Sequence, residues 1–148
     1  MNERLNVLND STDRNDTYVT SLRDTNKIYV SVAGFKVCAL LDSGATLSTI
    51  NHVIYNQLKT RSDIQLINCF RQCVLADGST INLNTIIRVP LRITNATFIV
   101  DLYVLVNNHI DMIIGCDILN KLRAVIDYNN QQFIVNGETQ NKETIASL

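Results

Sequence analysis

The residues best suited to chemistry are Asp42-Ser43-Gly44, which directly follow the apolar run that ends in Leu40-Leu41. A carboxyl group at the end of such a run lies against an apolar wall, where burial penalises its charged form and suits it to acid–base catalysis. The Ser43 hydroxyl can bond a backbone group and hold the loop, while Gly44 and Ala45 are small enough for another chain to approach closely. The segment therefore predicts Asp42 as a catalytic residue in a supporting loop.

Two other interpretations of this segment carry less weight. A nucleophilic Ser43 would need an activating histidine and a GxSxG motif, and the sequence provides neither around it. An ordinary turn aspartate is compatible with the triplet alone, because Asp-Ser/Thr-Gly arises by chance in roughly one of ten to twenty chains of this length. The triplet gains its specificity from the segments that precede and follow it.

Two further segments complete the candidate site. Ala76-Asp77-Gly78-Ser79 has the composition of a hairpin turn, and a hairpin here can bend and serve as a flap over the site. The run from Ile113 to Leu119 is an apolar strand that is broken by Gly115 and leads into a short helix, for which Asp117 is a suitable N-cap. We expect Gly115 and Asp117 to support the fold rather than to take part in the chemistry.

The elements that position these segments are predicted to be mostly strands. Residues 1–24 predict a flexible N-terminal arm and residues 137–148 a polar tail, which leaves one domain over 25–136. Within it we expect a hairpin over 27–42 that turns at Ala33-Gly34, a helix over 49–61 capped by Asn51 or Thr49, strands over 63–93 with a two-residue turn at Asp77-Gly78, a strand over 95–108, a buried strand at 112–114 and a closing hairpin over 124–135. Many short strands with one or two helices predict an all-β fold, namely a small closed barrel.

Composition argues against several classes of function. The 148 residues carry a net charge of −1, which disfavours a nucleic-acid partner or docking to an acidic membrane. No stretch approaches the ~18 apolar residues of a membrane span, and the N-terminus lacks the apolar core of a signal peptide, so we expect a cytoplasmic chain. The four cysteines lack the spacing of zinc ligands. We therefore expect Cys38, Cys69, Cys73 and Cys116 to act as small buried apolar side chains of a protein in a reducing compartment. We expect no metal or organic cofactor.

Taken in this order and spacing, the three segments resemble the retropepsin family of aspartic proteases. The residues that carry the likeness are 41–46 for the catalytic loop, 76–79 for the flap and 113–119 for the strand, glycine and helix behind the site. The likeness covers roughly residues 27–136 and is greatest to gypsy-class LTR retrotransposon proteases and their domesticated relatives. Viral members usually have Asp in place of Thr46 and Arg in place of Cys116, and this pair braces their dimer; both are absent here, which suits the retrotransposon branch.

The resemblance implies a homodimer, because the chemistry needs two carboxyl groups and the chain contains one Asp-Ser-Gly. It implies that Asp42 acts as acid and base, that Ser43 braces the loop across the dimer axis, and that Gly44, Ala45 and Thr46 complete the loop. The expected activity is endopeptidase cleavage of an extended peptide, such as a retroelement Gag-Pol-type polyprotein. The alternative is a module of the same fold that dimerises or binds peptides without cutting them.

Overall fold

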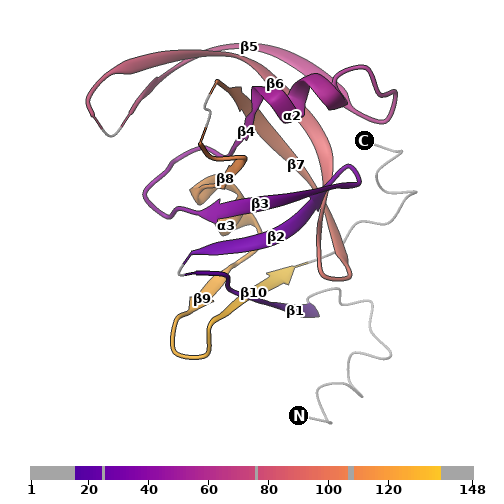
Figure 1. The fold of residues 1–148 in the computed structure, drawn as a ribbon, viewed down its shortest axis with the longest axis vertical. Helices are drawn as coiled ribbons and strands as arrows, with labels where there is room; N and C mark the ends of the chain where they lie inside the picture. Colours follow the sequence, from indigo (N-terminus) through magenta and orange to yellow (C-terminus); the bar gives the residue numbers. More distant parts are fainter. Residues whose placement is uncertain (1–15, 25, 76, 107–108, 138–148) are drawn as a thin grey trace.

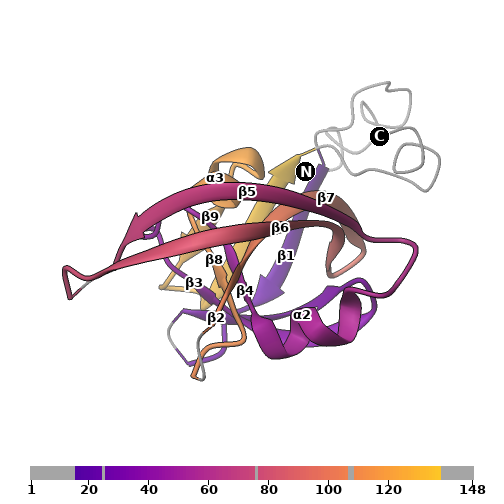
Figure 2. The same cartoon turned by 90° about the horizontal axis from the view of Figure 1, so that it is seen from above.

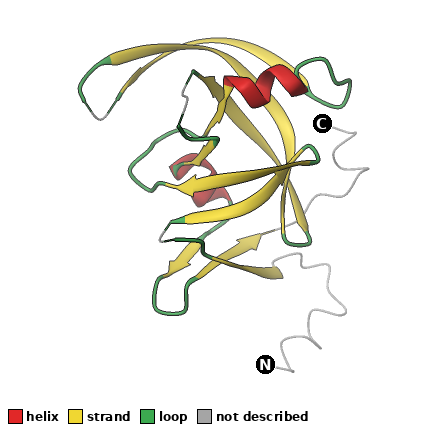
Figure 3. Ribbon diagram, in the orientation of Figure 1, coloured by secondary structure: helices red, strands yellow, loops and turns green. Residues whose placement is uncertain are grey.

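The computed structural model describes residues 16–24, 26–75, 77–106 and 109–137, and strands dominate this part of the chain (Figure 3). In chain order the elements are β1 (Asp16–Ser21), β2 (Lys27–Val32), β3 (Phe35–Leu41), β4 (Thr49–Asn51), α2 (His52–Leu58), β5 (Gln65–Val74), β6 (Thr80–Ile93), β7 (Ala96–Leu105), β8 (Met112–Ile114), α3 (Cys116–Lys121), β9 (Val125–Asp127) and β10 (Gln132–Gly137). Among the residues described, no helix has the length and apolar character needed to cross a membrane.

The larger sheet closes into a barrel. Its strands follow the order β2-β3-β8-β4-β7-β6, and β6 returns to β2 through the pairs Ser31↔Arg92 and Val32↔Leu91. β5 pairs only with β6, so the β5–β6 hairpin extends beyond the ring and arches over it (Figures 1 and 2). This arrangement confirms the predicted all-β closed barrel with two short helices.

A second, three-stranded sheet of order β1-β10-β9 lies at the opposite end of the molecule from the β5–β6 hairpin (Figure 1). β1 pairs with β10 from Asp16↔Gly137 to Ser21↔Gln132, so the prediction that residues 16–21 belong to a flexible arm is wrong. The physical reason is the partner strand, which satisfies the backbone groups of β1 while Tyr18 packs against the core. The remainder of the predicted arm up to residue 15 and the tail from 138 lie outside the described residues.

The turns follow local sequence closely. Ala33 and Gly34 have φ of 49° and 92°, which makes the predicted two-residue turn of the β2–β3 hairpin. The β5–β6 turn differs from the prediction, because Leu75 N donates to Ser79 O and three residues rather than two lie between them. Gly78, with φ of 87°, supplies the left-handed residue that ends such a three-residue loop. The closing hairpin of β9 and β10 is confirmed.

The barrel is filled by aliphatic side chains that alternate along its strands. In β2 the residues Ile28, Val30 and Val32 point inward, and in β3 the residues Val37, Ala39 and Leu41 do the same. Phe133 of β10 and Leu122 after α3 are also fully buried, which joins the second sheet and the helix to the same core. The inward set of β3 leaves the alternate residues of this strand on its other face, where the site lies.

Candidate active site

Asp42 lies directly after the end of β3 and is held there by main-chain bonds. Its N–H donates to Ile114 O of β8 at 3.0 Å, which continues the parallel β3–β8 pairing by one residue. Its carboxylate Oδ1 accepts from Gly44 N at 2.9 Å, and its carbonyl accepts from Ala45 N at 3.1 Å. The chain therefore turns sharply at Asp42, and this residue is half-buried.

The loop that begins at Asp42 returns to the barrel as β4, which inserts between β8 and β7. Thr49 is opposite Ile113 in the antiparallel pairing with β8 and opposite Tyr103 in the parallel pairing with β7. Both ends of the loop are thus fixed to the same sheet, on the side where the β5–β6 hairpin projects (Figure 1). A loop fixed at both ends is the kind of rigid support that a catalytic group needs.

Gly115 and the start of α3 pack directly against this loop. A Cβ atom at Gly115 would lie 2.7 Å from both Ala45 O and Leu47 O, so the close approach requires glycine. Cys116 N donates to Ala45 O at 2.8 Å, and Cys116 Sγ lies 2.9 Å from Ser43 O. The helix start therefore holds the loop through its backbone.

Asp117 completes this contact through Ser48, a residue that the sequence analysis missed. Ser48 is fully buried; its Oγ donates to Asp117 Oδ1 at 2.5 Å and accepts from Gly115 N at 2.8 Å. Ser48 N donates to Asp117 Oδ2 at 3.1 Å. The predicted N-cap role of Asp117 is wrong: α3 begins at Cys116 with Gly115 as its N-cap. The carboxylate of Asp117 accepts from Ile118 N at 2.7 Å as well as from the two donors of Ser48.

A signal for Ser48 was present in the sequence. It stands two residues before the buried Ile50, so a strand periodicity places both side chains on the inner face. A hydroxyl in that position must find a partner inside the protein, because an unpaired buried polar group is costly. By contrast, the predicted cap of α2 is confirmed, since Asn51 Oδ1 accepts from Val53 N at 2.9 Å.

A pocket of about 370 Å³ lies between the Asp42 loop and the β5–β6 hairpin. Gly44, Ala45, Thr46 and Leu47 line it from the loop, and residues of the β5–β6 hairpin line the opposite side. Thr49 of β4, Leu105 of β7 and Ile113 of β8 complete the lining. The predicted flap turn lies at the tip of that hairpin, where Ser79 N and Oγ both donate to Asp77 Oδ1. These bonds lower the pKa of Asp77 from its ordinary value. Ala76 lies outside the described residues.

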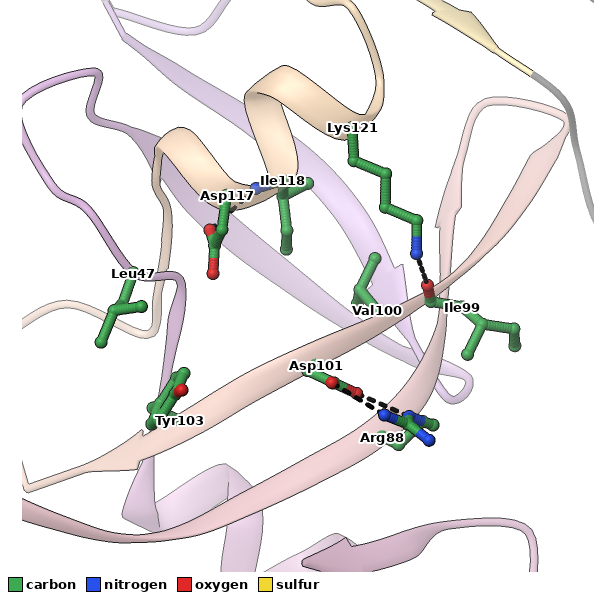
Figure 4. A pocket seen from close by; sticks show the side chains of 9 residues that line it. All are labelled: Leu47, Arg88, Ile99, Val100, Asp101, Tyr103, Asp117, Ile118 and Lys121. Atoms are coloured by element: carbon green, nitrogen blue, oxygen red, sulfur yellow. Dashed lines mark hydrogen bonds and ion pairs between the residues drawn. The ribbon is translucent and has the colours of Figure 1, made fainter. Parts of the chain in front are cut away.

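Two other pockets border the loop region. One of about 280 Å³ is lined by Cys38 and Leu40, which share a face of β3 with Asp42, and by Lys27, His109, Ile110 and Asp111. The other, of about 540 Å³, lies on the far side of Leu47 between α3 and the β6–β7 strands (Figure 4). Asp42 is therefore flanked in the chain by Leu40, which lines the pocket of about 280 Å³, and by Gly44, which lines the pocket of about 370 Å³.

Asp42 is the single aspartate of the sequence in an Asp-Ser-Gly segment, so one chain supplies one such carboxyl group. In the part of the chain that the structure describes, no three His, Cys, Asp or Glu side chains are grouped as metal ligands. All four cysteines are free. The arrangement can perform acid–base chemistry on a bound molecule if a second carboxyl group is supplied.

Comparison with known proteins identifies the class and then the family. The closed barrel is shared with solved aspartic protease structures, and the profile of the retroviral aspartyl protease family matches residues 7–141. The chain belongs to this family, which confirms the resemblance seen in the sequence. The narrower likeness to gypsy-class members stays a prediction.

Three solved structures illustrate the likeness in fold. The retroviral protease-like domain of Ddi1 from Leishmania major matches with TM-score 0.58 and 20% identity, over 84% of this chain and 98% of that one. EIAV protease, complexed with the inhibitor HBY-793, matches with TM-score 0.57 and 22% identity, over 73% and 97%. A retropepsin-like aspartic protease from Rickettsia conorii matches with TM-score 0.56 and 18% identity, over 84% and 92%. No curated protein sequence matches the chain.

Proposed function

We propose that this chain is one subunit of a homodimeric aspartic endopeptidase in which Asp42 and its copy activate a water molecule. The observation that carries the proposal is the rigid loop at the end of β3, which begins at the half-buried Asp42 and is anchored at both ends. A two-fold axis brings identical residues face to face, so one Asp42 from each subunit makes a pair. No other aspartate of the chain stands in an equivalent segment.

In this dimer the two carboxyl groups share one proton, because like charges held close cannot both ionise cheaply. The ionised group takes a proton from water as general base, and water attacks the scissile carbonyl carbon. The protonated group hydrogen-bonds the carbonyl oxygen, and a proton is then passed to the leaving amine. Ser43, whose side chain is exposed, braces the loop across the axis, and Gly44 leaves room for the substrate backbone.

The substrate in this proposal is an extended peptide held beneath two flaps, one from each β5–β6 hairpin. An extended peptide can pair with such a hairpin like an added strand, and the pockets on each side of Asp42 take its side chains. The polyprotein of a retroelement, which must be cut at several sites, is the substrate that the family membership favours.

The test is cleavage of a mixed peptide library by the wild-type chain and by Asp42→Asn, read by mass spectrometry. We expect Asp42→Asn to lower the cleavage rate by at least about 10³-fold, as removal of a central catalytic group does. Asp24→Asn is the matched control, because Asp24 has φ of 52° and asparagine tolerates that left-handed backbone equally well. Equal cleavage by Asp42→Asn and wild type would refute the proposal.

Dimerisation is tested separately by sedimentation over a range of concentrations, with cleavage measured in parallel. The specific activity per subunit should rise with concentration in the range where monomer converts to dimer. A chain that dimerises yet cleaves nothing would instead be the binding module described above as the alternative. A chain that cleaves as a monomer would contradict the paired-carboxyl mechanism.

A further inference from the structure

We infer that Arg71 is a specificity-determining residue, which selects substrates with an acidic side chain, glutamate or aspartate, in the pocket beside the Asp42 loop. The inference rests on the proposed function, because it names the substrate class of that same site. Arg71 lies on β5 and lines the pocket of about 370 Å³ together with Gly44 and Leu47. It therefore stands on the flap wall opposite the loop that carries the catalytic carboxyl group.

The guanidinium of Arg71 is available to a ligand. Its Cζ lies 6.0 Å from the centroid of the Tyr103 ring, which supports the group from one side and leaves its N–H donors unused by that contact. No ion pair joins Arg71 to a carboxylate among the described residues. An arginine that forms no ion pair can offer two parallel N–H donors to an incoming carboxylate.

The rest of the pocket suits the stem of an acidic side chain. Most of its walls are apolar, with Val74, Ile81, Leu83 and Ile113 among them, and none of the described residues that line it is acidic. The methylene groups of a glutamate can lie against these walls while the carboxylate reaches the guanidinium at the rim. A lysine in the same position would bring its ammonium group toward Arg71 and be disfavoured.

The charge of this pocket distinguishes it from the other two. In the pocket of Figure 4, the two basic residues Arg88 and Lys121 are matched by two acidic residues, Asp101 and Asp117. In the pocket of about 280 Å³, which Cys38 and Leu40 line, Lys27 and Asp111 provide charges of opposite sign. Counted over the described residues that line the three pockets, only the pocket beside the Asp42 loop therefore carries a net charge, and it is positive.

The acidic side chain should stand near the scissile bond but not at it. The residues that line the pocket begin at Gly44 and do not include Asp42, so the pocket is displaced from the reacting carbonyl. In the proposed homodimer the pocket occurs twice, once on each side of the cleavage point. We therefore expect one selective position before the scissile bond and one after it.

The test compares cleavage of four peptides that differ at one flanking position, with Glu, Gln, Leu or Lys, scanned through three positions on each side of a mapped cleavage site. For wild type we expect kcat/KM about fivefold higher for Glu than for Gln at one position on each side, since the charge pair is partly exposed. In Arg71→Gln this ratio should fall to about one, and in Arg71→Glu below one; the ratio is measured within each variant, so it does not depend on the overall activity of that variant. High salt should reduce the wild-type ratio.

Arg92→Gln is the matched control, because Arg92 is an exposed arginine that bonds Thr94 O and lines none of the three pockets. It should keep the wild-type ratio. A Glu-to-Gln ratio of about one in wild type, or a ratio that persists in Arg71→Gln, overturns the inference.

A binding measurement separates this inference from the proposed function. Fluorescence anisotropy of the labelled Glu and Gln peptides with the Asp42→Asn chain reports selectivity without any cleavage. If wild type cleaves no peptide but Asp42→Asn binds the Glu peptide about fivefold more tightly, the endopeptidase proposal fails and the role of Arg71 stands. Equal affinities, or no binding of either peptide, overturn the role of Arg71 whatever the activity.

Discussion

Replacing Gly115 with alanine should destabilise the protein and shift the loop that carries Asp42. The backbone of Gly115, with φ of −99° and ψ of −170°, is one that alanine adopts without strain. In open space the substitution would therefore stabilise the fold by about 0.4–1 kcal/mol, through the lower entropy of the unfolded chain. The sign of the measured effect thus depends on the packing around the added methyl group.

That packing is tight and consists of backbone. The new Cβ would lie 2.7 Å from Ala45 O, 2.7 Å from Leu47 O and 2.9 Å from Leu47 C, whereas ordinary contacts begin at 3.4 Å. Neither carbonyl can rotate away as a side chain would, and Ala45 O already accepts from Cys116 N. Such overpacking costs about 1–3 kcal/mol, so we expect a net destabilisation of about 1–2 kcal/mol.

Equilibrium unfolding in guanidinium chloride, at one fixed chain concentration, measures this change. A loss of that size corresponds to a fall in Tm of about 3–8 °C for a chain of this length. Gly78→Ala is a matched control, because Gly78 has φ of 87° and no atom of the described residues lies within 4 Å of the added Cβ, so the expected cost is that of the backbone. An unfolding free energy of Gly115→Ala equal to or above wild type would refute the reasoning.

Three further predictions concern the core, the flap turn and the strands behind the site. Phe133→Ala should cost about 3–5 kcal/mol in urea unfolding, because the ring is fully buried; a loss under about 1 kcal/mol would contradict the packing. Ser79→Ala should raise the pKa of Asp77 toward its ordinary value, as seen by NMR titration, since the Ser79 hydroxyl is the main cause of its lowering. Because the pKa of Asp77 is lower in the folded than in the unfolded protein, its ionised carboxylate contributes stability above the unfolded pKa. This contribution is lost as pH falls through the folded pKa, so the variant should lose less stability in acid than wild type. Asp101→Asn should cost at most about 1 kcal/mol and less in high salt, because the Arg88–Asp101 side chains are 38% and 40% exposed; a cost that salt does not change would argue against the ion pair.

The sequence by itself determined the features that depend on neighbours along the chain. The turn at Ala33-Gly34, the cap at Asn51 and the strand that ends just before Asp42 each follow from local residue types and periodicity. The alternation in β2 and β3 also fixed which side chains enter the core. These local patterns, together with the order of the three segments, were sufficient to predict the family and the closed-barrel fold.

The tertiary structure decided the features that depend on residues far apart in the chain. Asp117 was predicted as the N-cap because aspartate suits a helix start, but Gly115 holds that position, and the carboxylate of Asp117 also binds both donors of Ser48, 69 residues away. β1 became a strand because β10 offers it a complete ladder of backbone partners. Arg71 reaches the pocket from a strand with a bulge between Asn68 and Arg71, and such a bulge changes which residues face which side. No local pattern reports these contacts, because their partners meet only when the barrel closes.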